Sequence, residues 1–280
     1  MEVPGGVIEV TIGPTEPSVP ESALLRWVAS SARAVSAYYG RFPVPRLRLN
    51  IVTGWRGRVG YGTTWCQDAP SIRISVGRAT AEADLAEDWI LTHEMVHLGF
   101  PDMPRAHHWI EEGLATYVEP VARARIGTLT EERVWRDLAD GLPKGLPGPD
   151  DAGLDGTRSW GPTYWGGALF WLTADVGIRE RTRNRRGVED ALSGILAAGG
   201  DACAHWDVER ALEAGDRATG VPVLRELYAR MGSSPSRVDL EALWRRLGVV
   251  RRGEELLFDE RAPLSAVRRS ITRPREAPGP

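Results

Sequence analysis

Hydrophobic and polar residues alternate in three short segments of the first third of the chain. These segments are residues 8–12, 47–51 and 72–76, each with an apolar side chain at every second position. A period of two is typical of strands that bury one face. Residues 21–39 instead place apolar side chains at helical spacing, and Gly40 follows as a helix stop. The pattern therefore predicts a strand, a helix and two more strands, in that order.

A second helical pattern begins near Ala81 and contains a largely apolar stripe. The stripe consists of Leu85, Trp89, Thr92 and Val96. We expect one continuous helix here, which ends at the Pro-rich turn of residues 100–104. Residues 54–62 are rich in Gly and too irregular for a helix. Residues 141–161 are rich in Gly, Pro and Asp, which predicts a long loop that could cover a cleft.

The remaining pattern predicts a division of the chain into two lobes and a tail. Helical patterns with short breaks continue to about Val249, whereas Pro, Arg and Ser dominate from Arg261 onward. We expect a mixed sheet lobe over residues 1–98, a helical lobe over residues 99–250, and a partly disordered tail over residues 251–280. The last ten residues should be disordered.

The helix expected from Ala81 onward carries His93 and His97, four residues apart. Residues at this spacing share one helix face, so both imidazoles can reach one Zn²⁺. Glu94 follows the first His directly. In a His-Glu-x-x-His pattern, such a Glu is placed to act on a metal-bound water rather than to bind the metal.

A catalytic zinc site needs a third protein ligand and an open position for water. Glu111 and Glu112 are both candidates, and the residues alone do not choose between them. His107 and His108 precede them, but neighbouring residues on a helix point in directions about 100° apart. We therefore expect one of these two His to face solvent and the other to pack near the cleft, rather than two further ligands.

The His-Glu-x-x-His of residues 93–97, followed by Trp-x-x-Glu-Gly-x-Ala-x-Tyr in residues 109–117, resembles the zinc peptidases whose third ligand is Glu, the gluzincins. In that pattern the Glu directly before Gly is the ligand. The resemblance therefore implies that Glu112 is the third zinc ligand and that Glu111 lies outside the ligand set.

Residues 163–170 resemble the Tyr-x-x-Gly-Ala-Leu segment of the same enzymes, which implies that Tyr164 stabilises the transition state. The alternative is a Tyr buried in the helical lobe. Thr116, one helical turn after the expected third ligand, is a candidate to orient a ligand. Residues 175–192 and 211–249 look most like the glycyl aminopeptidase family.

The resemblance implies an α+β fold of the thermolysin-like zincin kind, with a small mixed sheet lobe followed by a mainly helical lobe. In that family the edge strand of the sheet runs along the cleft and pairs with the extended substrate. Residues 63–65 or 71–73 could supply this edge, and the sequence does not decide between them.

The function implied is that of a zinc-dependent peptidase, with an aminopeptidase-like catalytic domain and a peptide or protein substrate. One alternative is an endopeptidase of the same fold, because residues 60–65 offer no Glu to hold a substrate amino group. Another is a peptide-binding module without catalysis. Glu94 argues against that module, because a binding scaffold needs the ligands but not the base.

Composition gives no reason to expect nucleic acid or an anionic membrane as partner, since the net charge is −3. The chain has no apolar run long enough to span a membrane. The oligomeric state cannot be predicted from this sequence.

The chain contains two Cys, Cys66 and Cys203. Its first residues lack the basic and apolar regions of a signal peptide, so we expect a cytoplasmic location unless a leader has been removed. Because nothing in the sequence indicates secretion, we also expect two free, buried thiols rather than a disulfide.

Overall fold

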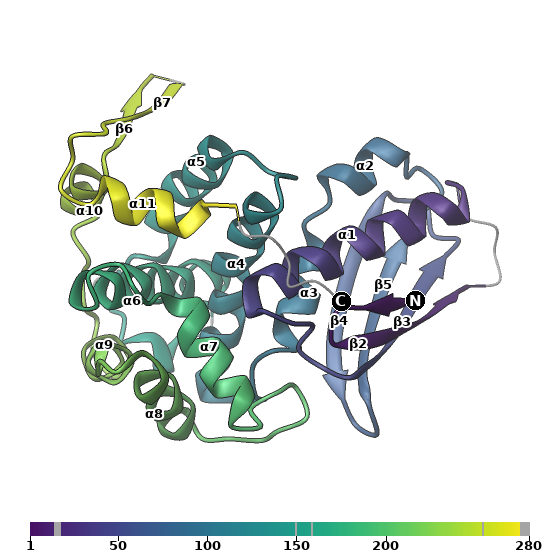
Figure 1. Ribbon diagram of the computed structural model, residues 1–280, viewed down its shortest axis with the longest axis horizontal. Helices are drawn as coiled ribbons and strands as arrows, with labels where there is room; N and C mark the ends of the chain where they lie inside the picture. The colour runs from purple at the N-terminus through teal and green to yellow at the C-terminus, as the bar shows by residue number, and fades with distance from the viewer. Residues whose placement is uncertain (14–17, 149, 158, 254, 275–280) are drawn as a thin grey trace.

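A five-stranded sheet lies at one end of the molecule and a group of helices forms the other, in the residues that the computed structural model describes (Figure 1). Those residues are 1–13, 18–148, 150–157, 159–253 and 255–274. The fold is α+β, as the sequence predicts. Among the described residues, no helix combines the length and the apolar character that a membrane span requires.

The sheet has the strand order β1-β2-β3-β5-β4. Its strands are β1 (Glu2–Val3), β2 (Gly6–Ile12), β3 (Arg46–Thr53), β4 (Val59–Cys66) and β5 (Pro70–Val76). β2, β3 and β5 run parallel and contain the three alternating segments of the sequence. β1 and β4 are antiparallel to their neighbours and form the two edges.

The position of β4 decides between the two candidate edges. Residues 63–65 lie in β4, the outer strand of the described sheet, whereas residues 71–73 lie in β5, between β3 and β4. The sequence offered residues 63–65 as one candidate edge but predicted no strand over the first half of β4, because that half belongs to the Gly-rich segment. The pairing of β4 with β5 shifts register between Val59 and Gly62, which explains why no regular alternation marks this strand.

Helices surround the buried side chains of both parts. α1 (Glu21–Tyr39) has the predicted bounds and ends at Gly40, whose φ of 83° is the left-handed conformation of many helix C-caps. The helices of the larger group are α4 (His108–Arg125), α5 (Glu131–Gly141), α6 (Gly167–Arg181), α7 (Val188–Ala197), α8 (Val208–Thr219), α9 (Val223–Met231), α10 (Leu240–Leu247) and α11 (Ser265–Thr272).

The expectation of one helix from Ala81 onward is wrong. Two helices occur, α2 (Glu82–Glu87) and α3 (Ile90–His97). Asp88 lies between them with an extended ψ of 133°, and its carboxylate accepts backbone N–H groups at the start of α3. A carboxylate in this position stabilises a new helix start. Trp89 is consequently 51% exposed instead of continuing an apolar stripe.

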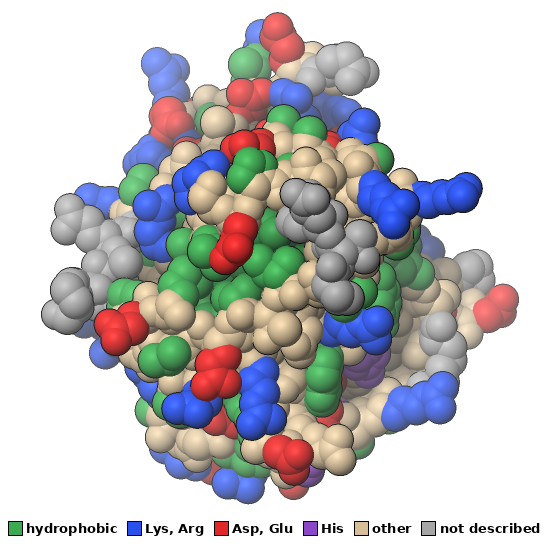
Figure 2. Space-filling view, turned by 90° about the vertical axis from the view of Figure 1, so that its right-hand side faces the viewer, with side chains coloured by type: hydrophobic (Ala, Val, Ile, Leu, Met, Phe, Trp, Pro, Cys, Tyr) green, Lys and Arg blue, Asp and Glu red, His purple; other side chains and the backbone are tan. Residues whose placement is uncertain are grey.

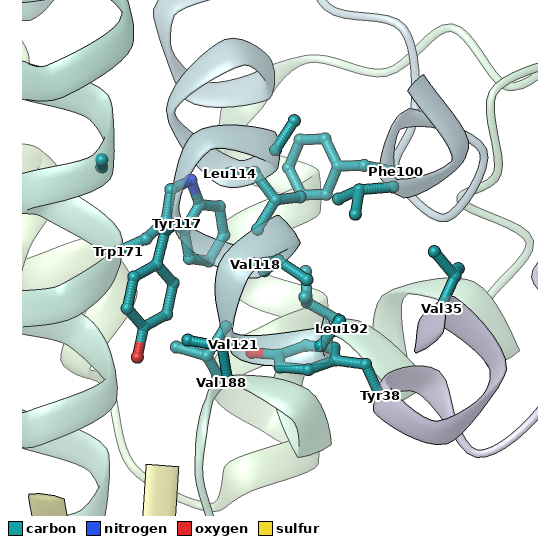
Figure 3. Close-up of a cluster of buried hydrophobic side chains, with 14 of the residues drawn as sticks. Val35, Tyr38, Phe100, Leu114, Tyr117, Val118, Val121, Trp171, Val188 and Leu192 are labelled. Atoms are coloured by element: carbon teal, nitrogen blue, oxygen red, sulfur yellow. The ribbon is translucent and has the colours of Figure 1, made fainter. Parts of the chain in front are cut away.

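The core joins α1, α4, α6 and α7 (Figure 3). In Figure 3 the side chains of Val35, Tyr38, Phe100, Leu114, Tyr117, Val118, Val121, Trp171, Val188 and Leu192 meet between these helices. Each of them is nearly or fully buried. This shared core fixes α4, which carries one part of the candidate site, against the helices around it.

Part of the expected tail is folded. β6 (Val249–Arg252) and β7 (Glu255–Phe258) form a hairpin, and α11 then packs its Ile271 side chain fully into the core. Residues 275–280, most of the ten expected to be disordered, lie outside the described residues.

The long loop expected at 141–161 contains two short 3₁₀ turns, Leu142–Gly145 and Leu154–Gly156, with residues 149 and 158 not described. The lobe boundaries at 98 and 250 stay predictions.

Cys66 and Cys203 form a disulfide, so the expectation of two free thiols is wrong. The two residues are 137 positions apart in sequence. Cys66 ends β4, and Cys203 lies in the segment after α7. A β-bridge between His205 and Asp102, which follows α3, holds this segment beside the end of α3. Cys203 lies there within reach of Cys66. The disulfide thus connects the edge of the sheet to the helical part.

Candidate metal centre

Three of the predicted residues meet at one point. His93 and His97 come from α3 and Glu112 from α4, and one ligand atom from each lies within 4.8 Å of the other two. Glu112 Oε2 is 3.2 Å from His93 Nε2 and 3.8 Å from His97 Nε2. Two imidazoles and one carboxylate are a donor set of catalytic zinc sites, so these residues fit the metal that the sequence predicts.

A close contact between helices holds Glu112 in this position. A Cβ atom on Gly113 would lie 2.2 Å from the backbone of Gly167, and one on Gly167 would lie 2.2 Å from the carbonyl oxygen of Trp109. Only Gly permits such an approach of α4 and α6 without displacement of the backbone. The Gly after Glu112 therefore has a packing role that places the centre and α6 side by side.

The ionisation of the three residues suits a cation. Burial lowers the pKa of His97 to about 4, so its imidazole is neutral and keeps a lone pair at pH 7. Burial alone would raise the pKa of Glu112, but hydrogen bonds from His108 and His93 hold it well below its usual value. Glu112 is therefore a carboxylate beside the neutral imidazole of His97.

Glu94 is held against the edge strand. The Thr64 hydroxyl, on β4, donates a hydrogen bond to Glu94 Oε2 at 2.6 Å. The Glu94 side chain is buried, and this burial raises its pKa. A Cβ atom on Gly62 would lie 2.6 Å from Glu94 Cγ, so Gly62 allows the strand to approach. The contact with Thr64 was not predicted, because the sequence does not show how the edge strand approaches α3.

Tyr164 lies on a π-helical turn (Pro162–Gly166) that leads into α6. Its phenol lies beside Glu112 in the cleft, and its ring stacks on His93 with 6.3 Å between the ring centroids. Burial and the Glu112 charge raise the pKa of Tyr164 to about 12. π-helical turns often occur at functional sites, where they redirect a side chain. The phenol thus faces the cluster instead of the core.

His108 contacts two carboxylates in the cleft. Its Nε2 is 3.1 Å from Glu112 Oε1 and its Nδ1 is 3.4 Å from Glu111 Oε2. Glu111 is turned to His108 and lies outside the group of three that could bind a metal. His107 instead contacts the hydroxyl of Tyr228, at 3.1 Å. The two His thus point apart, as expected, although the more exposed one, His108, is the one at the cleft.

Thr116 does not contact a ligand atom of the described centre. Its hydroxyl donates to the backbone carbonyl of Glu112 at 2.7 Å.

Glu119, seven residues after Glu112 and on the same helix face, was not predicted. It is buried and bonded to Arg123 at 3.0 Å, and burial raises its pKa to about 7 against the lowering effect of the Arg123 charge. Its spacing from Glu112 is the sequence signal that could have revealed it.

A cleft of about 490 Å³ opens at the centre. It runs along β4 from Tyr61, past Glu94 and the His pair, to the disulfide and His205. Figure 2 shows purple His side chains in a recess at the right of this face, with positive and negative side chains interspersed around it. The edge strand, Glu94 and the candidate ligands therefore line one continuous space.

The fold is that of solved zinc peptidase domains. An aminopeptidase N family protein from Idiomarina loihiensis matches with a TM-score of 0.66 and 13% identity, over 89% of this chain and 49% of that one. An M1 zinc metallopeptidase from Deinococcus radiodurans matches with a TM-score of 0.51 and 16% identity, over 82% of this chain and 50% of that one. The chain thus spans about half the length of these proteins.

No family model and no curated protein matches the sequence itself. At these identities the comparisons concern the fold, and at that level they confirm the predicted gluzincin-like, aminopeptidase-like domain. The closer likeness to glycyl aminopeptidases stays a prediction.

Proposed function

We propose that the protein is a zinc-dependent peptidase that hydrolyses peptide bonds. The observation that carries this proposal is the convergence of His93, His97 and Glu112 within 4.8 Å, with Glu94 and Tyr164 beside them. The structural neighbours support it, since they include a D. radiodurans M1 zinc metallopeptidase variant with a bound Tyr-Ser-Ala substrate, which matches with a TM-score of 0.52 and 15% identity.

His93, His97 and Glu112 would hold the zinc. A bound Zn²⁺ would lower the pKa of its water to about 7 and polarise the scissile carbonyl. His108 keeps the second oxygen of Glu112 occupied, which favours coordination through the oxygen that faces the two His.

Glu94 is the proposed general base. Burial raises its pKa, which makes the carboxylate a better proton acceptor than an exposed Glu. The Thr64 hydroxyl holds one carboxylate oxygen, so the other can take a proton from water and deliver it to the leaving amine. The Thr64 contact therefore restricts the base to one orientation.

Tyr164 is the proposed donor to the developing oxyanion. Its high pKa keeps the phenol protonated, so the O–H is available throughout the reaction. In the described part of the chain, β4 is an outer strand that pairs with β5 on one side only, so its other side can bind an extended peptide by backbone hydrogen bonds.

Cleavage at a free amino terminus requires a group in the cleft that holds the amino group of the substrate. Residues 60–65 of β4 contain no carboxylate to hold an amino group. This observation favours the endopeptidase alternative over strict aminopeptidase action. Peptides with a free and with an acetylated amino terminus separate the two, because an aminopeptidase cleaves only the former.

The proposal is tested by metal content and cleavage in parallel. We expect about one Zn²⁺ per chain, lost from His93→Ala and His97→Ala, and peptide hydrolysis that stops on chelation and returns with zinc. Elemental analysis and a peptide-library cleavage assay measure both. Protein that binds no zinc after incubation with it would refute the centre, whereas zinc without cleavage would favour the peptide-binding module.

A further inference from the structure

A second hollow adjoins the candidate metal centre. It measures about 470 Å³ and lies between α3, α4, α5 and the π-helical turn. It shares Trp89, His93 and Tyr164 with the first cleft, so the two spaces meet at the metal cluster. Three Trp side chains line it, Trp89, Trp160 and Trp165, and we call it the tryptophan hollow.

Two of these Trp side chains are open to solvent beside the centre. Trp89 is 51% exposed and lies edge-on to His93 at 5.4 Å, whereas Trp160 is 60% exposed and stacks on Tyr164 at 5.9 Å. Uncovered aromatic surface is costly in water and commonly marks a binding site. Because these rings contact a proposed ligand and the proposed oxyanion donor, whatever covers them lies next to the reacting bond.

The charged side chains around the tryptophan hollow mostly neutralise one another. The ion pairs are Arg133 with Asp137 at 2.9 Å, Arg123 with Glu119 at 3.0 Å, and Asp140 with Arg251. Lys144 lies over the Trp165 ring, 5.6 Å from its centroid. Glu87 is the remaining charged residue of the lining and is exposed at the lip. Aromatic rings thus form the part of the lining next to the metal cluster, and most of the charged side chains of the lining are paired with one another or with neighbouring residues.

We propose that the tryptophan hollow is the subsite for a large aromatic side chain, carried by the peptide residue next to the cleaved bond. This proposal rests on the proposed peptidase function and adds a substrate class to it. An aromatic ring between Trp89 and Trp160 replaces exposed indole surface with ring contacts. The backbone of the same residue then lies at His93 and Tyr164, where the two spaces meet.

The test measures binding without cleavage. Zinc-loaded Glu94→Gln protein is titrated with alanine pentapeptides that carry a single Phe at each position in turn. Burial of a Phe side chain favours binding by about 10- to 100-fold over Ala. We expect such a gain at one position of the peptide and little change at the others, because one side chain occupies the hollow.

Two Trp variants and a matched control locate the gain. In the Glu94→Gln background, Trp160→Ala and Trp89→Ala should each reduce the Phe-to-Ala ratio to below about 5-fold, since each removes one wall. Trp55 is 45% exposed and lines neither hollow, so Trp55→Ala should keep the ratio. Melting temperatures check that all three variants are folded.

The outcomes separate this proposal from the proposed function. Equal Phe-to-Ala binding ratios in the three Trp variants would overturn the aromatic subsite. So would tighter binding of a matched peptide that carries Lys in place of Phe at the selected position. Wild-type protein that cleaves all the peptides at similar rates would also overturn it, with the peptidase function retained. If no peptide is cleaved but the Phe gain depends on Trp89 and Trp160, the tryptophan hollow binds aromatic side chains as part of a peptide-binding module, and the peptidase function fails.

Discussion

Two side chains from distant parts of the chain hold the carboxylates of the candidate centre. Thr64, on the edge strand, donates to Glu94 at 2.6 Å, and His108 lies 3.1 Å from the outer oxygen of Glu112. Partners of this kind fix the orientation of a ligand or base before substrate arrives, which lowers the free-energy cost of reaching the reactive geometry. The centre is therefore held by its neighbours as well as by its own helices.

Replacement of the base should separate metal binding from chemistry. Glu94→Gln removes the proton acceptor but leaves the group of His93, His97 and Glu112 intact. We expect an unchanged zinc content and a fall in kcat of roughly 10²–10⁴-fold. Elemental analysis and a peptide assay measure the two. Turnover near the wild-type rate would show that another group acts as base.

Removal of a single phenol oxygen should test the oxyanion donor. Tyr164→Phe changes almost no volume, so the melting temperature should hold, whereas kcat should fall by about 10²–10³-fold at nearly constant KM. Tyr228→Phe is the matched control, because this phenol bonds to His107 and Asp155 away from the metal cluster. Full activity of Tyr164→Phe would assign Tyr164 a structural role.

Residue-scale prediction from the sequence depended on local spacing. His93 and His97 are one helical turn apart, and the family resemblance assigned Glu112, so these positions needed no knowledge of the tertiary fold. Thr64 reaches Glu94 only through the packing of β4 against α3, and the role of His108 depends on how α4 approaches α3. No periodicity in the sequence encodes such contacts.

At the scale of elements, the start of α3 matters most for the centre. Asp88 accepts the backbone N–H groups of Ile90 and Leu91 at 3.2 and 3.1 Å, and its carboxylate also accepts the indole N–H of Trp27 on α1. His93 lies one turn further on. The cap therefore sets both the direction of α3 and its position against α1.

Loss of this cap should loosen the metal site. Asp88→Ala should lower the free energy of unfolding by about 1–2 kcal/mol, because the first N–H groups of α3 lose their acceptor. Zinc affinity should fall with it, since His93 lies near the frayed end. Denaturant unfolding and zinc titration measure both. Asp88→Asn keeps one of the two acceptor oxygens and should lose less stability than Asp88→Ala, so an equal loss in both variants would contradict the capping role.

The same segment shows why element prediction succeeded in part. Regular alternation located β2, β3 and β5, and regular helical spacing located α1 with its bounds. Helical spacing also continues across Asp88, so the pattern favoured one helix where a local cap starts a second. In β4, Gly and a register shift removed the alternation that identifies strands.

At the scale of the whole molecule, the disulfide is the feature that the sequence least predicts. Cys66 and Cys203 meet only because the segment after α7 returns to Asp102 and the end of β4. Disulfides persist mainly in oxidising compartments. We expected free thiols because the first residues lack a signal-peptide pattern, and the pairing shows that this step was wrong. The cytoplasmic location, which was expected from the same pattern, stays a prediction.

The disulfide should contribute to stability and to the geometry of the cleft. It closes a loop of 137 residues, and its loss should cost about 2–4 kcal/mol because the unfolded chain gains freedom. The melting temperature of the Cys66→Ser, Cys203→Ser double variant should then fall by roughly 5–15 °C. The wild type should show the same fall in melting temperature in reductant, and the double variant should not respond to reductant at all.

Because Cys66 ends the edge strand that lines the cleft, KM for peptides should rise in the double variant while zinc content holds. Two free thiols in unreduced, denatured wild-type protein would contradict the cross-link itself.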